Sequence, residues 1–169
     1  MAYNAGASSG NLILIQSQTA SAVASLAFTT GITGYDRYYI DIYNFSSTNQ
    51  VAFTLVFSTN AGSSYLNTGY YQEGPCASNT GYFGNSTING ASILLTNTPN
   101  ANAGFNGIGG FNLCFTSGNQ QSILGNMYDG FANWAVGGLN TGTTVVNAIR
   151  FDIAAGTFSG NFKLYGVQN

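Results

Sequence analysis

The sequence predicts an all-β domain, a sandwich or barrel of about ten short antiparallel strands. Stretches that alternate apolar and polar residues recur along the chain, and turn-forming residues separate them about every 8–12 residues. No window keeps an apolar stripe at helical spacing over several turns, because Gly, Asn, Ser and Thr interrupt it. Aromatic residues make up 14% of the chain and supply large side chains for a core.

The N-terminal part of the chain contains three predicted strands. Residues 11–16 contain the apolar run Leu12–Ile15, which is typical of a strand that is buried on both faces. Residues 20–27 have the best helix propensity of the chain, yet every second residue from Ala22 to Phe28 matches one face of a strand. Residues 38–45 alternate in the same way and predict a strand with one face in the core.

A hairpin is predicted next. Every second residue of 51–57, starting with Val51, is a large apolar residue on one face. Residues 59–62 read Thr-Asn-Ala-Gly and have turn chemistry, because Asn and Gly tolerate a positive φ. Residues 65–71 are the expected partner strand.

The second half of the chain continues the pattern. Shorter runs predict strands over residues 91–95, 111–115, 122–127 and 133–136. In residues 145–153 the alternation places Phe151 and its second neighbours in the core and Ala148, Arg150 and Asp152 on the other face. Residues 158–165 alternate similarly and place Lys163 outward, so Asp152 is expected to pair with Lys163 across strands.

A single domain is predicted from the length of 169 residues. Residues 11–169 are assigned to the sandwich, and residues 1–10, which are small and polar, to a flexible or docking N-terminal arm. Residues 74–89 and 97–110 are rich in Gly and Asn and are interpreted as long loops. Because long loops often carry function, we expect both on an outward or intersubunit surface.

Charged side chains are scarce: they make up 5% of the chain, compared with about 25% in an average soluble domain. They are Asp36, Arg37, Asp41, Glu73, Asp129, Arg150, Asp152 and Lys163. Three cations cannot line a phosphate track, so no nucleic-acid partner is expected. No apolar stretch is long enough for a transmembrane helix, so no membrane partner is expected either.

Catalytic and cofactor motifs are not found in the sequence. The chain has no histidine and no phosphate-binding glycine motif, which excludes imidazole chemistry and predicts no cofactor and no metal. The five acidic residues are interpreted as scattered solubilising charges, and a hydrolase would need two of them to converge in a cleft. We therefore expect that the protein is not an enzyme.

Cys76 and Cys114 are the only cysteines, and two thiols without histidine cannot complete a tetrahedral zinc site. They are expected to be reduced or buried thiols, or to form a disulfide, and both alternatives stay open. The first residues lack the basic and apolar regions of a secretory signal, so no signal peptide is expected.

Aromatic residues are the remaining candidates for a site: Tyr70, Tyr71, Tyr82 and Trp134. Such residues beside Asn can stack on sugars, but they are also enriched in protein interfaces and common in sandwich cores. A structural or assembly role is favoured over ligand binding. The alternative, a receptor- or carbohydrate-binding module, requires Trp134 to be exposed or Tyr70 and Tyr71 to line a groove.

Several strand ends and turns carry a resemblance to a known group of proteins. They are residues 16–21 (QSQTAS), 28–32 (FTTGI), 35–38 (YDRY), 57–65 (FSTNAGSSY), 147–151 (NAIRF) and 156–166 (GTFSGNFKLYG). In these segments the chain resembles small β-rich structural proteins of tailed bacteriophages, of the capsid decoration, head-fibre or tail-fibre type. The middle of the chain has no such match.

The resemblance implies a jelly-roll-like antiparallel β-sandwich that forms a homotrimer on a virion surface. The expected function is that of a non-enzymatic decoration (cement) or fibre protein, made in the host cytoplasm, which stabilises the particle by binding its assembled state. The implied partners are further copies of the chain and other virion proteins, such as a major capsid or tail protein. In the alternative, a tail-fibre module binds a host-surface glycan.

Overall fold

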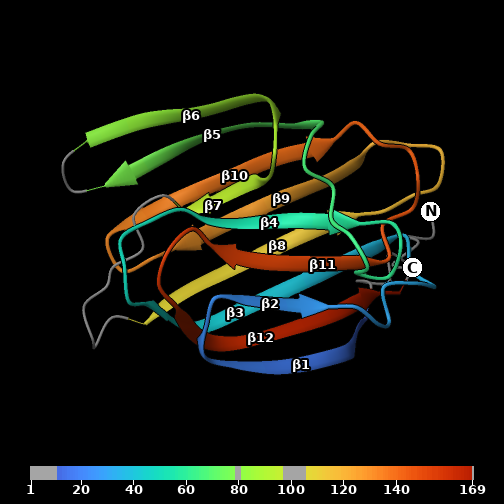
Figure 1. Ribbon diagram of the computed structural model, residues 1–169, viewed down its shortest axis with the longest axis horizontal. Helices are drawn as coiled ribbons and strands as arrows, with labels where there is room; N and C mark the ends of the chain where they lie inside the picture. The colour runs from blue at the N-terminus through green and yellow to red at the C-terminus, as the bar shows by residue number, and fades with distance from the viewer. Residues whose placement is uncertain (1–10, 79–80, 97–105, 169) are drawn as a thin grey trace, which may run out of the picture.

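The computed structural model consists of two antiparallel β-sheets packed face to face, and the part of the chain that it describes contains no helix. It describes residues 11–78, 81–96 and 106–168, with the backbone alone for residues 76–78 and 81–85. The predicted all-β sandwich is therefore confirmed, with twelve strands among the described residues rather than about ten (Figure 1).

The larger sheet has eight strands in the order β1-β12-β3-β8-β9-β10-β5-β6, so that β1 and β6 form its edges (Figure 1). Their bounds are β1 (Leu12–Val23), β12 (Phe158–Val167), β3 (Arg37–Ser47), β8 (Gly107–Cys114), β9 (Gln121–Tyr128), β10 (Ala132–Asn140), β5 (Tyr70–Ser78) and β6 (Gly81–Gly90). Strands β8, β9 and β10 form a meander, and β5 and β6 form a hairpin.

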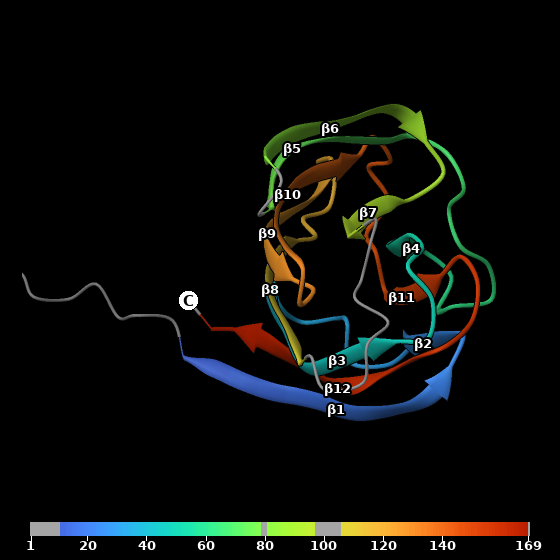
Figure 2. The same ribbon diagram turned by 90° about the vertical axis from the view of Figure 1, so that its left-hand side faces the viewer.

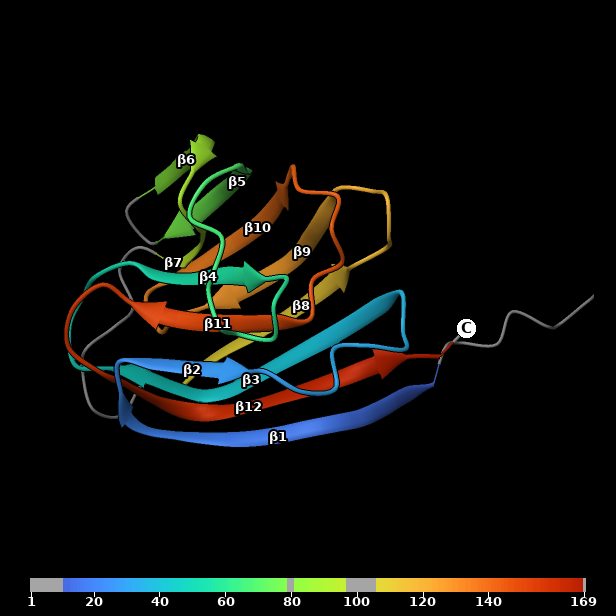
Figure 3. The same cartoon turned by 45° about the vertical axis from the view of Figure 1, so that its right-hand side comes forward.

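The smaller sheet has four strands in the order β2-β11-β4-β7. Their bounds are β2 (Ser25–Phe28), β11 (Ala148–Ile153), β4 (Phe53–Ser58) and β7 (Ile93–Thr96). Figure 2 shows that the larger sheet curves around the smaller one, and Figure 3 shows β1, β12 and β3 running beneath β2 and β11. The larger sheet thus has an inner face toward the smaller sheet and an outer face turned away from it.

The core lies between the two sheets and is built from the inward residues of both. Its aromatic centre is Phe53 on β4, which is fully buried. The Phe53 ring centroid lies 4.5 Å from that of Phe45, 5.1 Å from that of Phe158 and 5.8 Å from that of Phe151. Contacts between the two sheets therefore depend on large rings rather than on charge.

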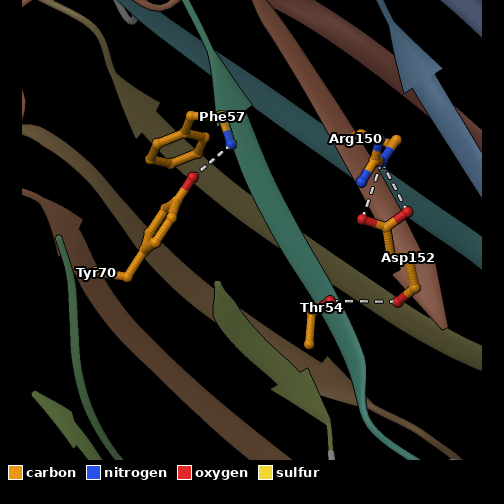
Figure 4. Close-up of polar contacts among 5 residues, drawn as sticks. All are labelled: Thr54, Phe57, Tyr70, Arg150 and Asp152. Carbon is orange, nitrogen blue, oxygen red and sulfur yellow. Dashed lines mark hydrogen bonds and ion pairs between the residues drawn. The ribbon is translucent and has the colours of Figure 1, made fainter. Parts of the chain in front are cut away.

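Polar side chains of β5 also tie the two sheets together. The backbone N–H of Phe57 on β4 donates a hydrogen bond to the Tyr70 hydroxyl over 2.7 Å (Figure 4). Two residues further along β5, the Gln72 amide bonds the backbone of β7: Leu94 N donates to Gln72 Oε1 over 2.7 Å, and Gln72 Nε2 donates to the Leu94 carbonyl. Both β5 side chains are buried, so these bonds are shielded from water.

We expect the Tyr70→Phe substitution to lower the free energy of unfolding by about 1–3 kcal/mol, because it removes the buried acceptor of the Phe57 N–H. Burial raises the pKa of Tyr70 from its ordinary value of 10.0 to about 12. The neutral hydroxyl therefore stabilises the fold fully below pH 10, and this contribution is lost as the pH rises toward 12. Denaturant unfolding at several pH values should show the difference between wild type and Tyr70→Phe shrinking over that range. A difference that does not change with pH would contradict the prediction.

The first predicted strand differs from expectation. Residues 11–16 were expected to be buried on both faces, but β1 is an edge strand whose residues Leu12, Ile13 and Leu14 are 50%, 41% and 52% exposed. The strand predicted around residues 20–28 is divided, because the chain turns at Ala22 (φ 51°) and passes from the larger sheet to the smaller one. An apolar run alone cannot distinguish an edge strand from a central one.

The predicted hairpin is also different. The turn at residues 59–62 is present, with positive φ at Ala61 and Gly62. Residues 65–71 are not the partner of β4, however, because β5 begins only at Tyr70 and pairs with β10 and β6 in the larger sheet. The loop predicted over residues 74–89 was also wrong, since this segment lies in the β5–β6 hairpin.

Two other predicted segments lie largely outside the described residues. The N-terminal arm, residues 1–10, is one of them. Of the loop predicted at residues 97–110, residues 97–105 lie outside the described part, and residues 107–110 form the start of β8.

Candidate functional site

The aromatic residues singled out from the sequence fall in different environments. Tyr70 is 0% exposed and Trp134 is 4% exposed, so neither ring can contact a ligand at the surface. Tyr71 is 38% exposed on the outer face of the larger sheet. The side chain of Tyr82 lies outside the described residues. Trp134 is therefore not exposed, as the carbohydrate-binding alternative required, and Tyr70 does not line a surface groove beside Tyr71.

Trp134 is held inside by Asp129, whose interpretation as a solubilising charge was wrong. Asp129 is 2% exposed, and its Oδ2 atom accepts a hydrogen bond from Trp134 Nε1 over 2.9 Å. Its Oδ1 atom accepts bonds from the backbone N–H groups of Phe131 (2.9 Å) and Ala132 (2.7 Å), and Thr96 Oγ1 also donates to Oδ2. The carboxylate is fully partnered and organises the β9–β10 turn.

Arg150 and Asp152 form the only ion pair among the described residues, with Arg150 Nε 2.8 Å from Asp152 Oδ1 (Figure 4). The predicted pair between Asp152 and Lys163 was wrong, because β11 and β12 belong to different sheets. Lys163 lies opposite Asp41 in the β12–β3 register, and its ammonium group lies 5.0 Å from the centroid of the Tyr43 ring.

A groove of about 670 Å³ crosses β3, β8, β9 and β10 on the outer face of the larger sheet, and we call it the outer-face groove. Strand alternation brings polar and aromatic side chains to it, because alternate residues of each strand point to the same face. The side chains that line it include Tyr39, Asp41, Asn112, Asn126, Tyr128 and Asn133.

Gly110 forms part of the floor of the outer-face groove and determines how Tyr39 lies. A Cβ atom at Gly110 would come within 2.5 Å of the Tyr39 hydroxyl oxygen, so a larger residue there would force the tyrosine side chain to shift. Burial raises the pKa of Tyr39, and the nearby Asp41 carboxylate and Tyr165 raise it further. The Tyr39 hydroxyl therefore stays protonated at neutral pH and can donate a hydrogen bond.

The amides in the groove have free hydrogen-bonding capacity. Among the described residues, no hydrogen bond engages the side chains of Asn112, Asn126 or Asn133. The amides of Asn140 and Asn147, which lie at strand ends, instead bond backbone groups of the chain. The groove thus presents donors and acceptors that the fold itself does not use.

Two smaller depressions extend the outer-face groove across the sheet. One, of about 370 Å³, lies over Leu124 and Ala135 and shares Asn126 with the groove. The other, of about 320 Å³, lies over Tyr71 and shares Glu73 with the previous one. We call the three together the outer-face trough. It runs from β3 to β6, which is five strand spacings or roughly 24 Å measured along the curved sheet. No Lys or Arg lines it.

Two carboxylates of the trough are too far apart to act as a hydrolytic pair. Asp41 on β3 and Glu73 on β5 are separated by four strand spacings, roughly 19 Å along the sheet. Glycosidase carboxylates lie about 5–10 Å apart. The arrangement therefore suits ligand contact rather than acid–base chemistry between these two residues.

Cys114 is a free thiol on β8, and its Sγ atom lies 3.3 Å from Thr116 Oγ1. The side chain of Cys76 lies outside the described residues. In the described part of the chain, no three Cys, Asp or Glu side chains are grouped so that they could hold a metal ion. The same part contains no helix capable of spanning a membrane.

Sequence reasoning missed the outer-face trough. Local alternation indicates that Tyr39 and Asp41 share a face, and that Asn126 and Tyr128 share a face. It does not indicate that β8 lies between β3, which carries the first pair, and β9, which carries the second. This strand order depends on pairing between segments that are distant in the sequence.

Comparison of the chain with protein-family models and with curated proteins found no match.

Proposed function

We propose that the protein is a non-enzymatic structural protein of a virion surface, which assembles as a homo-oligomer and stabilises or decorates the particle. The observation that carries the proposal is the exposed edge strand β1. The bacteriophage context and the trimeric state come from the resemblance in the strand ends and turns. A jelly-roll arrangement of the sandwich, of the kind common in capsid proteins, belongs to the same proposal.

Strand β1 has the properties of a strand that pairs with another chain. It pairs with β12 on one side only, and on the other side no described strand adjoins it. Its twelve residues include no charged residue and no proline, which are the usual means of blocking pairing at a sheet edge. Leu12, Ile13 and Leu14 together expose large aliphatic side chains on both of its faces. Pairing with a second copy would cover them and bond the open backbone groups.

The scarcity of charge fits the same proposal. Interfaces between subunits are depleted in charged residues and enriched in aromatic ones. With a single ion pair among the described residues, few surface contacts weaken when the salt concentration rises. Such a surface suits a particle component that must persist in variable surroundings, attached to a major capsid or tail protein.

The mass of the protein in solution tests this proposal. We expect light scattering after size-exclusion chromatography to give a multiple of 17.6 kDa for the wild type and the monomer mass for Leu14→Lys. A lysine on an edge strand opposes pairing with another strand, because its charge would be buried. Leu124→Lys is the matched control: Leu124 is equally apolar and 67% exposed, but it lies on the central strand β9. A wild-type monomer at all concentrations would contradict the proposal.

A further inference from the structure

We propose that the outer-face trough binds a neutral oligosaccharide, a role independent of self-association through β1. The proposal starts from the combination of groups in the groove. Tyr39 and Tyr128 supply aromatic rings for the apolar C–H faces of sugars, while Asn112, Asn126 and Asn133 supply amides for their hydroxyls. A few directed polar groups among apolar surfaces are the usual composition of a small-molecule site.

The charges of the trough indicate that the saccharide is neutral. Asp41 and Glu73 contribute carboxylates, which accept hydrogen bonds from sugar hydroxyls and repel sugar carboxylates, sulfates or phosphates. The nearest cation in the strand register is Lys163, opposite Asp41, and its ammonium group lies over the Tyr43 ring outside the trough. An anionic ligand would therefore find no cation among the lining residues.

The shape of the trough indicates a chain of sugars rather than a peptide. The trough crosses the strands, and its path of roughly 24 Å over the curved outer face (Figure 2) is long enough for several sugar rings. An extended peptide usually binds by adding a strand at a sheet edge, where backbone groups are free. On the face of the sheet the backbone groups are already paired within the ladder, so recognition depends on side chains.

Apolar side chains complete the contact surface. Leu124, which is exposed on β9, lies between Asn112 on β8 and Gly137 on β10 in the strand register. It therefore separates polar groups of the groove from those of the next depression. A sugar ring has both an apolar C–H face and hydroxyls, so the apolar and the polar groups of the trough each have a counterpart on such a ligand.

The test is a glycan array followed by calorimetric titration. The array should carry linear neutral gluco-, galacto- and manno-oligosaccharides of increasing length, together with sialylated and uronate-containing glycans of similar length. We expect neutral oligosaccharides to bind, and longer chains to bind more tightly than disaccharides. The best neutral oligosaccharide of the array is then the probe for the variants.

We expect Tyr128→Ala and Asn126→Ala each to weaken binding of that probe at least tenfold, a change of about 1.4 kcal/mol or more. Both residues are exposed, so truncating them should leave the melting temperature unchanged. Tyr65→Ala and Asn49→Ala are the controls, since they remove the same groups outside the trough, Tyr65 lying against Arg150 of the smaller sheet. We expect them to change affinity less than twofold.

Three results would overturn the proposal. One is that no neutral glycan binds, or that only acidic glycans bind. Another is that the trough variants bind the probe as tightly as the controls do. The last is that Tyr128→Ala or Asn126→Ala abolishes oligomers that the controls retain, because the trough would then be a subunit interface. A monomeric wild type that still binds the probe would refute the proposed assembly and leave this inference intact.

Discussion

Replacing Asp129 by alanine is expected to lower the free energy of unfolding by about 3–5 kcal/mol, because a buried hydrogen-bond network loses its centre. The Asp129 carboxylate accepts bonds from two backbone N–H groups, the Trp134 indole and the Thr96 hydroxyl. Without it, all four donors lose this acceptor, and three of the four bonds, from Ala132, Trp134 and Thr96, are buried. Urea unfolding followed by tryptophan fluorescence measures the loss, since the reporter Trp134 is a direct partner.

Two further variants show whether the network or the charge matters. Asp36→Ala removes an exposed carboxylate and should change stability by less than about 0.5 kcal/mol. Asp129→Asn keeps one acceptor oxygen but places an N–H group among donors, so we expect an intermediate loss. If Asp129→Ala lowered the free energy of unfolding as little as Asp36→Ala does, the Asp129 carboxylate could not be what organises the β9–β10 turn.

The second large effect is expected for Phe53→Ala, with a loss of about 3–5 kcal/mol in the free energy of unfolding. Phe53 is fully buried, and its ring contacts those of Phe45, Phe151 and Phe158. Truncation leaves a cavity between the sheets, where both walls are strands held in their own ladders and cannot collapse to fill it.

Phe131→Ala is the control for Phe53→Ala, because it deletes the same ring from a position that is 42% exposed. We expect it to cost less than about 1 kcal/mol by chemical denaturation. Equal losses in the two variants would mean that burial of the Phe53 ring does not hold the two sheets together.

The strands with regular alternation were predicted well from the sequence. In β11 the side chains of Ile149, Phe151 and Ile153 are buried as expected, and in β12 those of Phe158 and Phe162 are. Ala148, which was expected on the outward face of β11, is buried as well. Alternation succeeds here because each strand has one face toward the core and the other away from it. The same local rule led to the correct prediction of an all-β sandwich.

Predictions that depended on which other segment of the chain lies beside a residue were less successful. The run at Leu12–Leu14 suggested a central strand, but β1 lies at the sheet edge. Asp129 was predicted to be a solvent-exposed charge in a loop. In the structure, Trp134 and two backbone N–H groups of the β9–β10 turn donate hydrogen bonds to its carboxylate. Neither outcome depends on the residue itself; both depend on what another segment places beside it.

The order of the residues alone predicts the class of the fold, the faces of the regular strands and a surface with little charge. These properties are local or compositional, so they can be counted along the chain. Pairing between strands distant in the sequence is what brings Tyr39 and Asp41 into one trough with Asn126 and Tyr128. The reason is physical: strand order arises from pairing between distant segments, and two strands with the same pattern of alternation can take different places in a sheet.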